Sequence, residues 1–258
     1  MEAIVYCLLI ETVDGLLLVD TGFGTADYED PSLLMRAFMA WMDVPGRMEE
    51  TAVHQVEALG YSAGDVRHIV LTHLHLDHAG GLRDFPAAQV HVHRAEVEAI
   101  NDPRGLMARF YDARQWSHGP DWVLHDRADS DWYGFPSIGV AQDLPLDVRL
   151  IPLPGHSCGH CGVAVAVKDG WLLHCGDAAS PFHPRSDLHG LDRSAYAMAW
   201  LPGWLARRAL GPHVDGLRAL LRRHSKEVEV ISSHDLHSFR RCRHAVSSLD
   251  PAGDRLRL

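Results

Sequence analysis

The sequence predicts an α/β layered domain, because strand-like and helix-like segments are mixed along its 258 residues. Hydrophobic residues make up 47% of the chain, which is enough to bury a substantial core. Several apolar strand-like runs also end in a His or Asp, as expected where rigid strands deliver side chains to one edge. The length suits one large domain, so we expect residues 1–258 to fold as a single unit.

The N-terminal part predicts a hairpin, three helical segments and two further strands. VYCLLIETVDGLLLVDTG reads as two strands joined at Asp14-Gly15, a strong hairpin signal. Residues 30–60 contain the apolar-faced helical segments LLMRAFMAWM and AVHQVEAL. VRHIVLT then predicts a buried strand, the alternating run AQVHVH another strand, and RAEVEAI a helix.

Residues 101–147 have weak periodicity and many aromatic side chains. A long irregular stretch in a compact domain is typical of a functional loop, so we predict a lid or substrate-pocket insertion. The alternative is a small satellite core beneath a loop. The aromatic residues of this stretch are Phe110, Tyr111, Trp116, Trp122, Trp132, Tyr133 and Phe135.

The C-terminal part predicts more strands and a broken helical region. VRLIPLPGH is a strand that runs into a Pro-Gly turn, and CGVAVAVKDGWLLHCGDA is a hairpin that turns at 168–170. Residues 193–224 have helical patterns broken at Pro202-Gly203 and Gly211-Pro212. EVEVISSHD contains a last strand that ends at His234.

Composition and charge exclude several classes of protein. A formal net charge of −10 argues against a nucleic-acid-binding face. The five cysteines are odd in number and irregularly spaced, unlike a secreted disulfide framework. The N-terminal apolar run ends at Glu11, so we expect neither a secretory signal nor a membrane span and assign the protein to the cytoplasm. A homodimer is one assembly compatible with this sequence.

The stretch LTHLHLDHAGG predicts a metal site, because it places three histidines and an aspartate in six consecutive positions. A single His-x-His is usually a solvated loop. Here further His and Asp residues follow three later strands, and neutral imidazole plus carboxylate suits zinc, with iron or manganese as alternatives. The predicted ligands are His73, His75, Asp77, His78, His156, Asp177 and His234.

The spacing favours two divalent ions. His73 and His75 can project onto one ion, with His156 as the third nitrogen ligand. Asp77 and His78 can reach a second ion together with His234, and the carboxylate of Asp177 can bridge the pair. Two such ions share a hydroxide and polarise a carbonyl or phosphoryl oxygen.

The motifs THLHLDHAGG, PGHS, CGDA and SSHD, with LLLVDTG upstream, resemble the metallo-β-lactamase-fold hydrolase superfamily from about residue 5 to 237. The resemblance implies a four-layer αββα sandwich with a dinuclear metal site on one edge and the ligand division given above. It also implies that Asp20, in VDTG, supports the ligand loop. Without the resemblance, Asp20 would read as a turn residue at a strand end.

The branch of the family follows from the site residues. His78 and Asp177 stand where the true β-lactamases have an arginine and a cysteine, which argues against that activity. The spacing more closely resembles the quorum-quenching lactonases, but the tyrosine that those enzymes carry after the bridging aspartate is absent. Ser180 or His183 would have to replace it, and Phe182 and Trp200 would line the pocket. The glyoxalase II type is also similar, but only 24 residues follow His234, which argues against its helical substrate domain.

We therefore expect a metal-dependent hydrolase acting on an ester, lactone, amide or thioester of a small molecule. A bridging hydroxide would attack the carbonyl, with Asp177 bridging and Asp77 carrying the proton to the leaving group. Two alternatives are an iron-dependent redox enzyme similar to the sulfur dioxygenases and a metal-binding member without catalysis. Cys158 and Cys161 form a Cys-x-x-Cys that leads into a strand rather than a helix, so we interpret them as packing residues.

Overall fold

The computed structural model describes residues 4–104, 107–141, 144, 146–178, 213–236, 239 and 255–257. Two sheets of six strands face each other, with the strand orders β12-β1-β2-β3-β4-β5 and β11-β10-β9-β8-β7-β6. The strands are β1 (Leu8–Thr12), β2 (Gly15–Val19), β3 (Val66–Val70), β4 (Gln89–His93), β5 (Asp121–His125), β6 (Ser130–Trp132), β7 (Phe135–Gly139), β8 (Val148–Pro152), β9 (Cys161–Val167), β10 (Gly170–His174), β11 (Val228–Ile231) and β12 (Arg255–Arg257).

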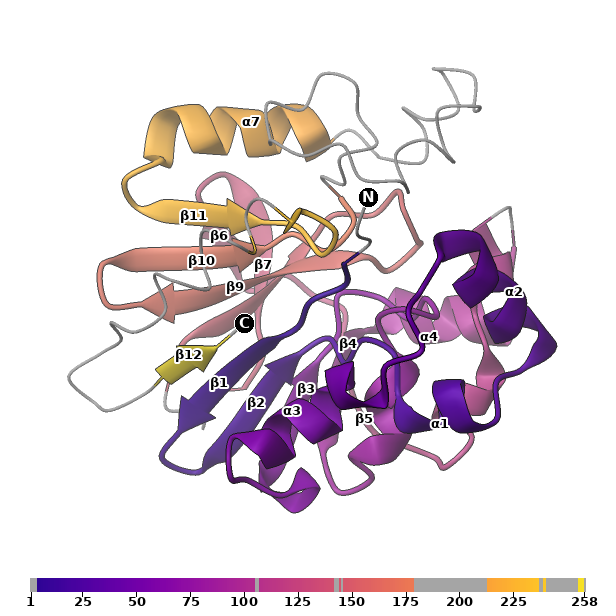
Figure 1. The fold of residues 1–258 in the computed structure, drawn as a ribbon. Coiled ribbons are helices and arrows are strands. Elements are labelled where there is room, and N and C mark those ends of the chain that lie inside the picture. The colour runs from indigo at the N-terminus through magenta and orange to yellow at the C-terminus, as the bar shows by residue number, and fades with distance from the viewer. Residues whose placement is uncertain are drawn as a thin grey trace.

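Helices cover the outer faces of both sheets (Figure 1). On one side lie α1 (Thr25–Glu29), α2 (Leu33–Met42), α3 (Ala52–Ala58) and α4 (Arg94–Asn101), and α7 (His213–His224) lies along β11 on the other. Five short 3-10 turns are described as well: η1 (Met48–Glu50), η2 (Ala63–Asp65), η3 (Gly80–Asp84), η4 (Met107–Phe110) and η5 (Ala113–Trp116). The predicted four-layer αββα sandwich is thus confirmed.

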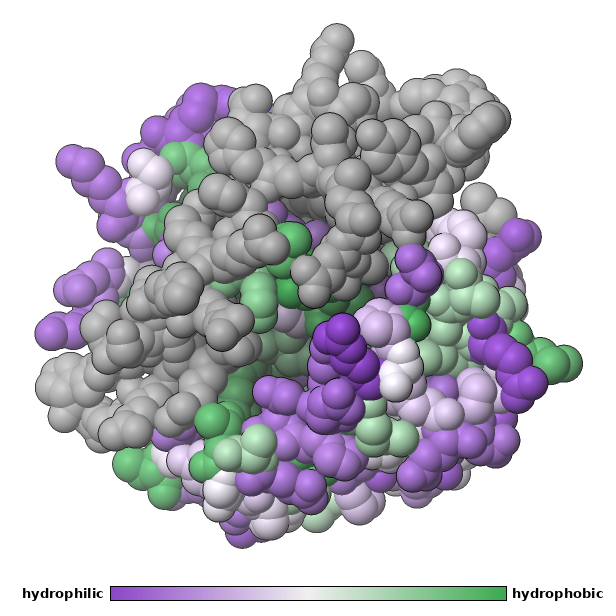
Figure 2. Space-filling model, viewed as in Figure 1, coloured by the Kyte–Doolittle hydropathy of each residue, from purple (hydrophilic) through white to green (hydrophobic). Residues whose placement is uncertain are grey.

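Three apolar cores hold the layers together. The sheets pack through fully buried side chains such as Leu17 of β2 and Val163 of β9. Val56 of α3 packs on the outer face of the first sheet, and Leu217 of α7 packs on the outer face of the second. Burying such side chains provides about 1.5–3 kcal/mol each, so the sandwich is a rigid support for the loops at its edge. In Figure 2 hydrophobic side chains gather in the middle of the visible face, while the surface on the side of α2 is a mixture of hydrophilic and hydrophobic side chains.

The sequence located most elements correctly. The hairpin at Asp14-Gly15 joins β1 and β2 in antiparallel register, with Leu9 opposite Leu18. The second predicted hairpin joins β9 and β10, with Leu173 opposite Ala164. Of the broken helical region 193–224, α7 is described and residues 193–212 lie outside the described residues.

The segment 101–147 is less irregular than its sequence indicates. Its described residues form two 3-10 turns and three strands, and β5 completes one sheet while β6 and β7 extend the other. These strands are short and mostly half-buried, which weakens their periodic pattern. The segment reaches the histidine cluster at and just after the turn at 107–110, since the rings of Phe110 and Tyr111 lie 5.7 Å and 5.1 Å from the ring of His75. Its role as a lid remains a prediction.

The histidine and aspartate residues follow strands whose carboxyl ends point to one edge. β2, β3, β4 and β5 run parallel to one another, and β10 and β11 run parallel in the second sheet.

Within the described residues, no helix has the length and apolar character needed to cross a membrane.

Candidate metal centre

The structure brings all seven predicted ligands together at the edge of the sandwich. They lie in the loops after β3, β8, β10 and β11, and each is at most 7% exposed. Burying so many polar side chains without partners would be costly, so the cluster needs compensating interactions.

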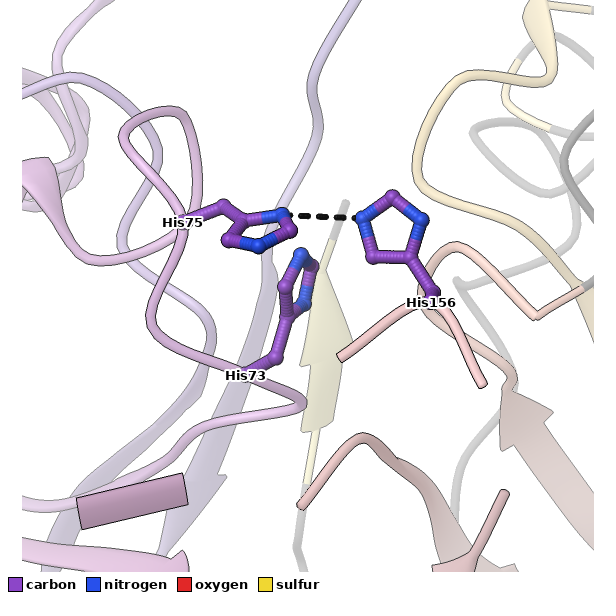
Figure 3. A group of neighbouring side chains, drawn as sticks. All are labelled: His73, His75 and His156. Carbon is purple, nitrogen blue, oxygen red and sulfur yellow. Dashed lines mark hydrogen bonds between the residues drawn. The ribbon is translucent and has the colours of Figure 1, made fainter. Parts of the chain in front are cut away.

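The cluster divides into two groups that match the sequence prediction. The ligand atoms of His73, His75 and His156 lie within 4.8 Å of one another, and so do those of Asp77, His78 and His234. Figure 3 shows the first group, in which two loops far apart in sequence turn their imidazoles toward a common centre. His75 Nδ1 and His156 Nε2 are 2.9 Å apart there.

Asp177 lies between the two groups. Its Oδ2 is 3.3 Å from Nε2 of His156, and its Oδ1 is 3.3 Å from Nε2 of His234. Oδ1 is also 3.5 Å from Nε2 of His78. Ligands bound tetrahedrally to zinc at about 2.0–2.1 Å are separated from each other by about 3.3 Å. One carboxylate oxygen thus faces each group at a separation that suits metal ligands.

Several buried atoms at this centre have no hydrogen-bond partner among the described residues. They include Nε2 of His73, Nε2 of His78 and Oδ1 of Asp177. The same three side chains form a third group of ligand atoms within 4.8 Å of one another. A divalent cation would satisfy these atoms together, so the residues present fit a metal centre.

Neighbouring groups fix the orientation of the imidazoles. His234 Nδ1 donates to the carbonyl oxygen of Ile4 at 2.8 Å, which leaves Nε2 directed at Asp177. His78 Nδ1 lies 2.9 Å from Oδ2 of Asp20, and this leaves its Nε2 for the centre. Such contacts set the tautomer and the direction of the remaining lone pair, as is usual around metal-binding histidines.

Asp20 also fixes the start of the ligand loop. Its Oδ1 accepts from the backbone N of Thr72 at 2.7 Å, and its Oδ2 accepts from the Thr72 hydroxyl at 2.8 Å. Asp20 is fully buried and adopts a positive φ of 56°, a backbone conformation that costs energy for a non-glycine residue. The structure therefore places Asp20 where a support of the ligand loop is expected.

The electrostatics differ between the two groups. Burial and the neighbouring imidazoles hold the pKa of His73 and His75 well below the usual value. Burial likewise lowers the pKa of His156, against the attraction of Asp177. These three histidines are thus neutral at pH 7, the form that binds metal.

In the second group, nearby carboxylates favour the protonated form of the imidazoles. Burial alone would lower the pKa of His234, but Asp177 and Asp77 raise it to about 9. Burial also opposes ionisation of Asp177, yet His234, His78 and His156 hold its pKa well below the usual value. Metal binding here would displace protons, which makes it dependent on pH.

Two residues close to the centre were not assigned a role from the sequence. Glu96 of α4 is fully buried and bonds to both ligand loops. Nε2 of His160 accepts from the backbone N of Asp177 at 3.0 Å. Neither contact follows from local patterns, because each joins segments distant in the chain. The only sequence signal is the acidic residue in the first turn of RAEVEAI.

The other residues singled out from the sequence are either outside the described part of the chain or cysteines. Ser180, Phe182, His183 and Trp200 lie outside the described residues. Cys158 is exposed and Cys161 is buried, both as free thiols. Burial raises the pKa of Cys161 far above its usual value, which disfavours a reactive thiolate.

Comparison with known proteins agrees with the fold. Residues 2–234 match the metallo-beta-lactamase superfamily, and the chain belongs to this family. A probable metallo-hydrolase of Mycobacterium tuberculosis is 40% identical over 240 residues, which cover 89% of this chain and 74% of that protein. The N-acyl homoserine lactonase of Bacillus cereus is 35% identical over 177 residues, covering 68% of this chain and 64% of that protein.

The solved structures show the same fold. An N-acyl homoserine lactone hydrolase with the product N-hexanoyl-L-homoserine at its catalytic metal centre has a TM-score of 0.62 and 22% identity. The alignment covers 94% of this chain and 86% of that one. A dizinc quorum-quenching lactonase aligns with a TM-score of 0.54 and 17% identity, over 91% of this chain and 73% of that one.

Proposed function

We propose that this chain is a hydrolase that holds two divalent ions, most simply zinc, and cleaves an ester or lactone of a small molecule. The observation that carries the proposal is the place of Asp177, whose two oxygens each lie 3.3 Å from an imidazole of a different group. His73, His75 and His156 would hold one ion, and Asp77, His78 and His234 the other. The lactonase of Bacillus cereus and the probable metallo-hydrolase of Mycobacterium tuberculosis support hydrolysis as the reaction class.

Two ions held in this way supply a hydroxide at neutral pH and polarise the carbonyl oxygen of the substrate. Side chains of the protein would transfer the proton and exclude water. Asp77 is 6% exposed and its Oδ2 lies 3.5 Å from Nε2 of His234, so it can carry a proton to the leaving oxygen. Phe110 and Tyr111 flank His75 at ring distances of 5.7 Å and 5.1 Å and provide an apolar wall that excludes water.

The first test is elemental analysis of protein purified without added metal. We expect two zinc ions per chain in the wild type and fewer in Asp177→Ala, because that change removes the carboxylate shared by both groups. Asp169→Ala is the matched control, since Asp169 is exposed in the turn between β9 and β10. Asp177→Asn serves if the alanine variant does not fold.

Turnover of a panel of lactones, N-acyl homoserine lactones, esters and thioesters then tests the reaction. Hydrolysis that needs both ions supports the proposal. One iron per chain with oxygen uptake would favour the redox alternative instead. Two ions without turnover of any compound in the panel would favour a metal-binding protein without catalysis.

A further inference from the structure

Glu96 connects the two loops that carry the first histidine group. Its Oε1 accepts from the backbone N of Leu74 at 3.0 Å, between His73 and His75. Its Oε2 accepts from the backbone N of Gly159 at 2.9 Å and from the Ser157 hydroxyl at 2.7 Å, next to His156. One fully buried carboxylate thus fixes backbone on both sides of this group.

A fourth donor joins the same carboxylate to the aromatic wall. The Tyr111 hydroxyl donates to Oε1 of Glu96 at 2.9 Å, and the Tyr111 ring lies 5.1 Å from the His75 ring. Burial and the Glu96 charge raise the pKa of Tyr111 well above its usual value, so this hydroxyl stays a donor. Four donors satisfy both oxygens of a buried charge, which is the condition for such a charge to be stable.

The loop of His156 is built to approach α4 closely. A side-chain carbon added at Gly159 would lie 2.3 Å from the backbone N of Glu96, a distance no real contact shows. Glycine is required there because the loop backbone packs directly on the first turn of α4. Both the hydrogen bonds of Glu96 and this close packing hold the loop of His156 against the first turn of α4.

Among the described residues, the hydrogen bonds of Glu96 go to Leu74, Tyr111, Ser157 and Gly159, and none goes to the second group. His78 is oriented by Asp20, and His234 by the carbonyl oxygen of Ile4. The two groups are therefore supported by different residues, with Asp20 on one side and Glu96 on the other. His73 lies between them, because its neighbour Thr72 bonds to Asp20 and its neighbour Leu74 bonds to Glu96.

We propose that Glu96 is a positioning residue that holds His73, His75 and His156 in ligand geometry before a metal ion binds. The proposal rests on the proposed function for the identity of the ligands. Loss of the Glu96 carboxylate then weakens the ion of the three-histidine group selectively. Residues that orient metal ligands typically change metal affinity by about 10- to 100-fold, and we expect a change of that size.

The experiment is a chelator competition for zinc on metal-free wild type, Glu96→Gln and Glu98→Gln. Glutamine keeps the size of Glu96, but its amide nitrogen cannot accept from two of the four donors. Glu98 is the matched control, because it is exposed on the same helix. We expect Glu96→Gln to keep one ion at wild-type affinity and to bind the other about 10- to 100-fold more weakly, with Glu98→Gln unchanged.

Combining Glu96→Gln with a second substitution shows which of the two ions is bound more weakly. In His234→Ala the remaining tight ion belongs to the three-histidine group, and there Glu96→Gln should weaken it. In His75→Ala the remaining ion belongs to the second group, and there Glu96→Gln should leave it unchanged. Equal weakening in both backgrounds, or none in either, would overturn the role of Glu96.

Amide hydrogen exchange on metal-free protein gives a second readout that does not depend on metal. Glu96→Gln should speed exchange at Leu74 and Gly159 and leave Thr72, which is bound to Asp20, unchanged. If Glu96→Gln does not fold, Tyr111→Phe removes one of the four donors and should give a smaller effect of the same kind. A wild type that binds fewer than two ions overturns the proposed function; a wild type with two ions and unchanged exchange in the variant overturns only the role of Glu96.

Discussion

Oδ2 of Asp20 lies 2.9 Å from Nδ1 of His78, and both side chains are completely buried. Although burial opposes ionisation of Asp20, His78 lowers its pKa, so the carboxylate is charged at neutral pH. The charged acceptor fixes the proton of His78 on Nδ1 and leaves Nε2 directed at Asp177, 3.5 Å away.

Asp20→Asn should therefore weaken metal retention by about 10- to 100-fold. The asparagine amide has one acceptor oxygen, so it cannot accept both from the backbone N of Thr72 at the Oδ1 position and from His78 and the Thr72 hydroxyl at the Oδ2 position. Metal content after dialysis against a weak chelator measures the effect. Asp14→Asn in the exposed hairpin turn is the control. Full retention by Asp20→Asn would show that the contact does not orient His78.

Removal of metal should destabilise the folded chain. Ligand binding to the native state adds about 2.7 kcal/mol when the free ligand is 100 times its dissociation constant. For a domain of this size, about 1 kcal/mol changes the melting temperature by about 2–4 °C. We expect a strong chelator to lower the melting temperature by roughly 5–10 °C and added zinc to restore it. Identical melting curves with and without metal, measured by calorimetry, would contradict a buried metal centre.

Local patterns were sufficient to predict an α/β layered domain and a cluster of ligands at strand ends, whereas the four-layer sandwich was predicted from the resemblance to the metallo-β-lactamase-fold family. VRHIVLT reads as a buried strand, so the histidines that follow it had to lie at a strand end. The same argument applied to His156, Asp177 and His234, and the structure places them together. The predicted hairpins were correct for the same reason, since a turn signal and two apolar runs are adjacent in the chain.

Features that depend on distant contacts could not be predicted. Glu96 lies 22 residues from Leu74 and 63 from Gly159, and nothing in RAEVEAI shows that its carboxylate would be buried. The strands within 101–147 were missed because β5 has one exposed and four half-buried residues and β6 has only three residues. In a half-buried edge strand, apolar and polar side chains alternate only weakly. The prediction for residues 101–147 therefore rested on their aromatic content.

Gly80→Ala should destabilise the protein, because η3 packs against the start of α1 without space for a side chain. An added carbon at Gly80 would lie 2.2 Å from Oδ2 of Asp27 and 2.6 Å from the carbonyl oxygen of Gly22. Forcing an extra methyl into a packed site typically costs about 1–3 kcal/mol. Gly46→Ala is the control, since nothing lies within 4 Å of its added carbon. Equal chemical denaturation midpoints for the two variants would contradict this packing.

Asp27 should make stability depend on pH in a predictable direction. Burial raises the pKa of Asp27 from 3.8 to about 6, against the hydrogen bond from the backbone N of Gly24. The folded state therefore holds this proton more tightly than the unfolded state, so the contribution of Asp27 to stability is most favourable below pH 4. It decreases as the pH rises toward 6 and is then constant.

Asp27→Asn removes the ionisation while keeping an oxygen that can accept from Gly24. Relative to wild type, its free energy of unfolding should increase by about 1 kcal/mol between pH 5 and pH 8, because only the wild type must bury a charge at the higher pH. Asp43→Asn on the exposed end of α2 is the control and should follow the wild type. Urea denaturation at the two pH values measures the difference. A difference between Asp27→Asn and wild type that stays constant with pH would mean that the Asp27 carboxylate titrates alike in the folded and unfolded chain.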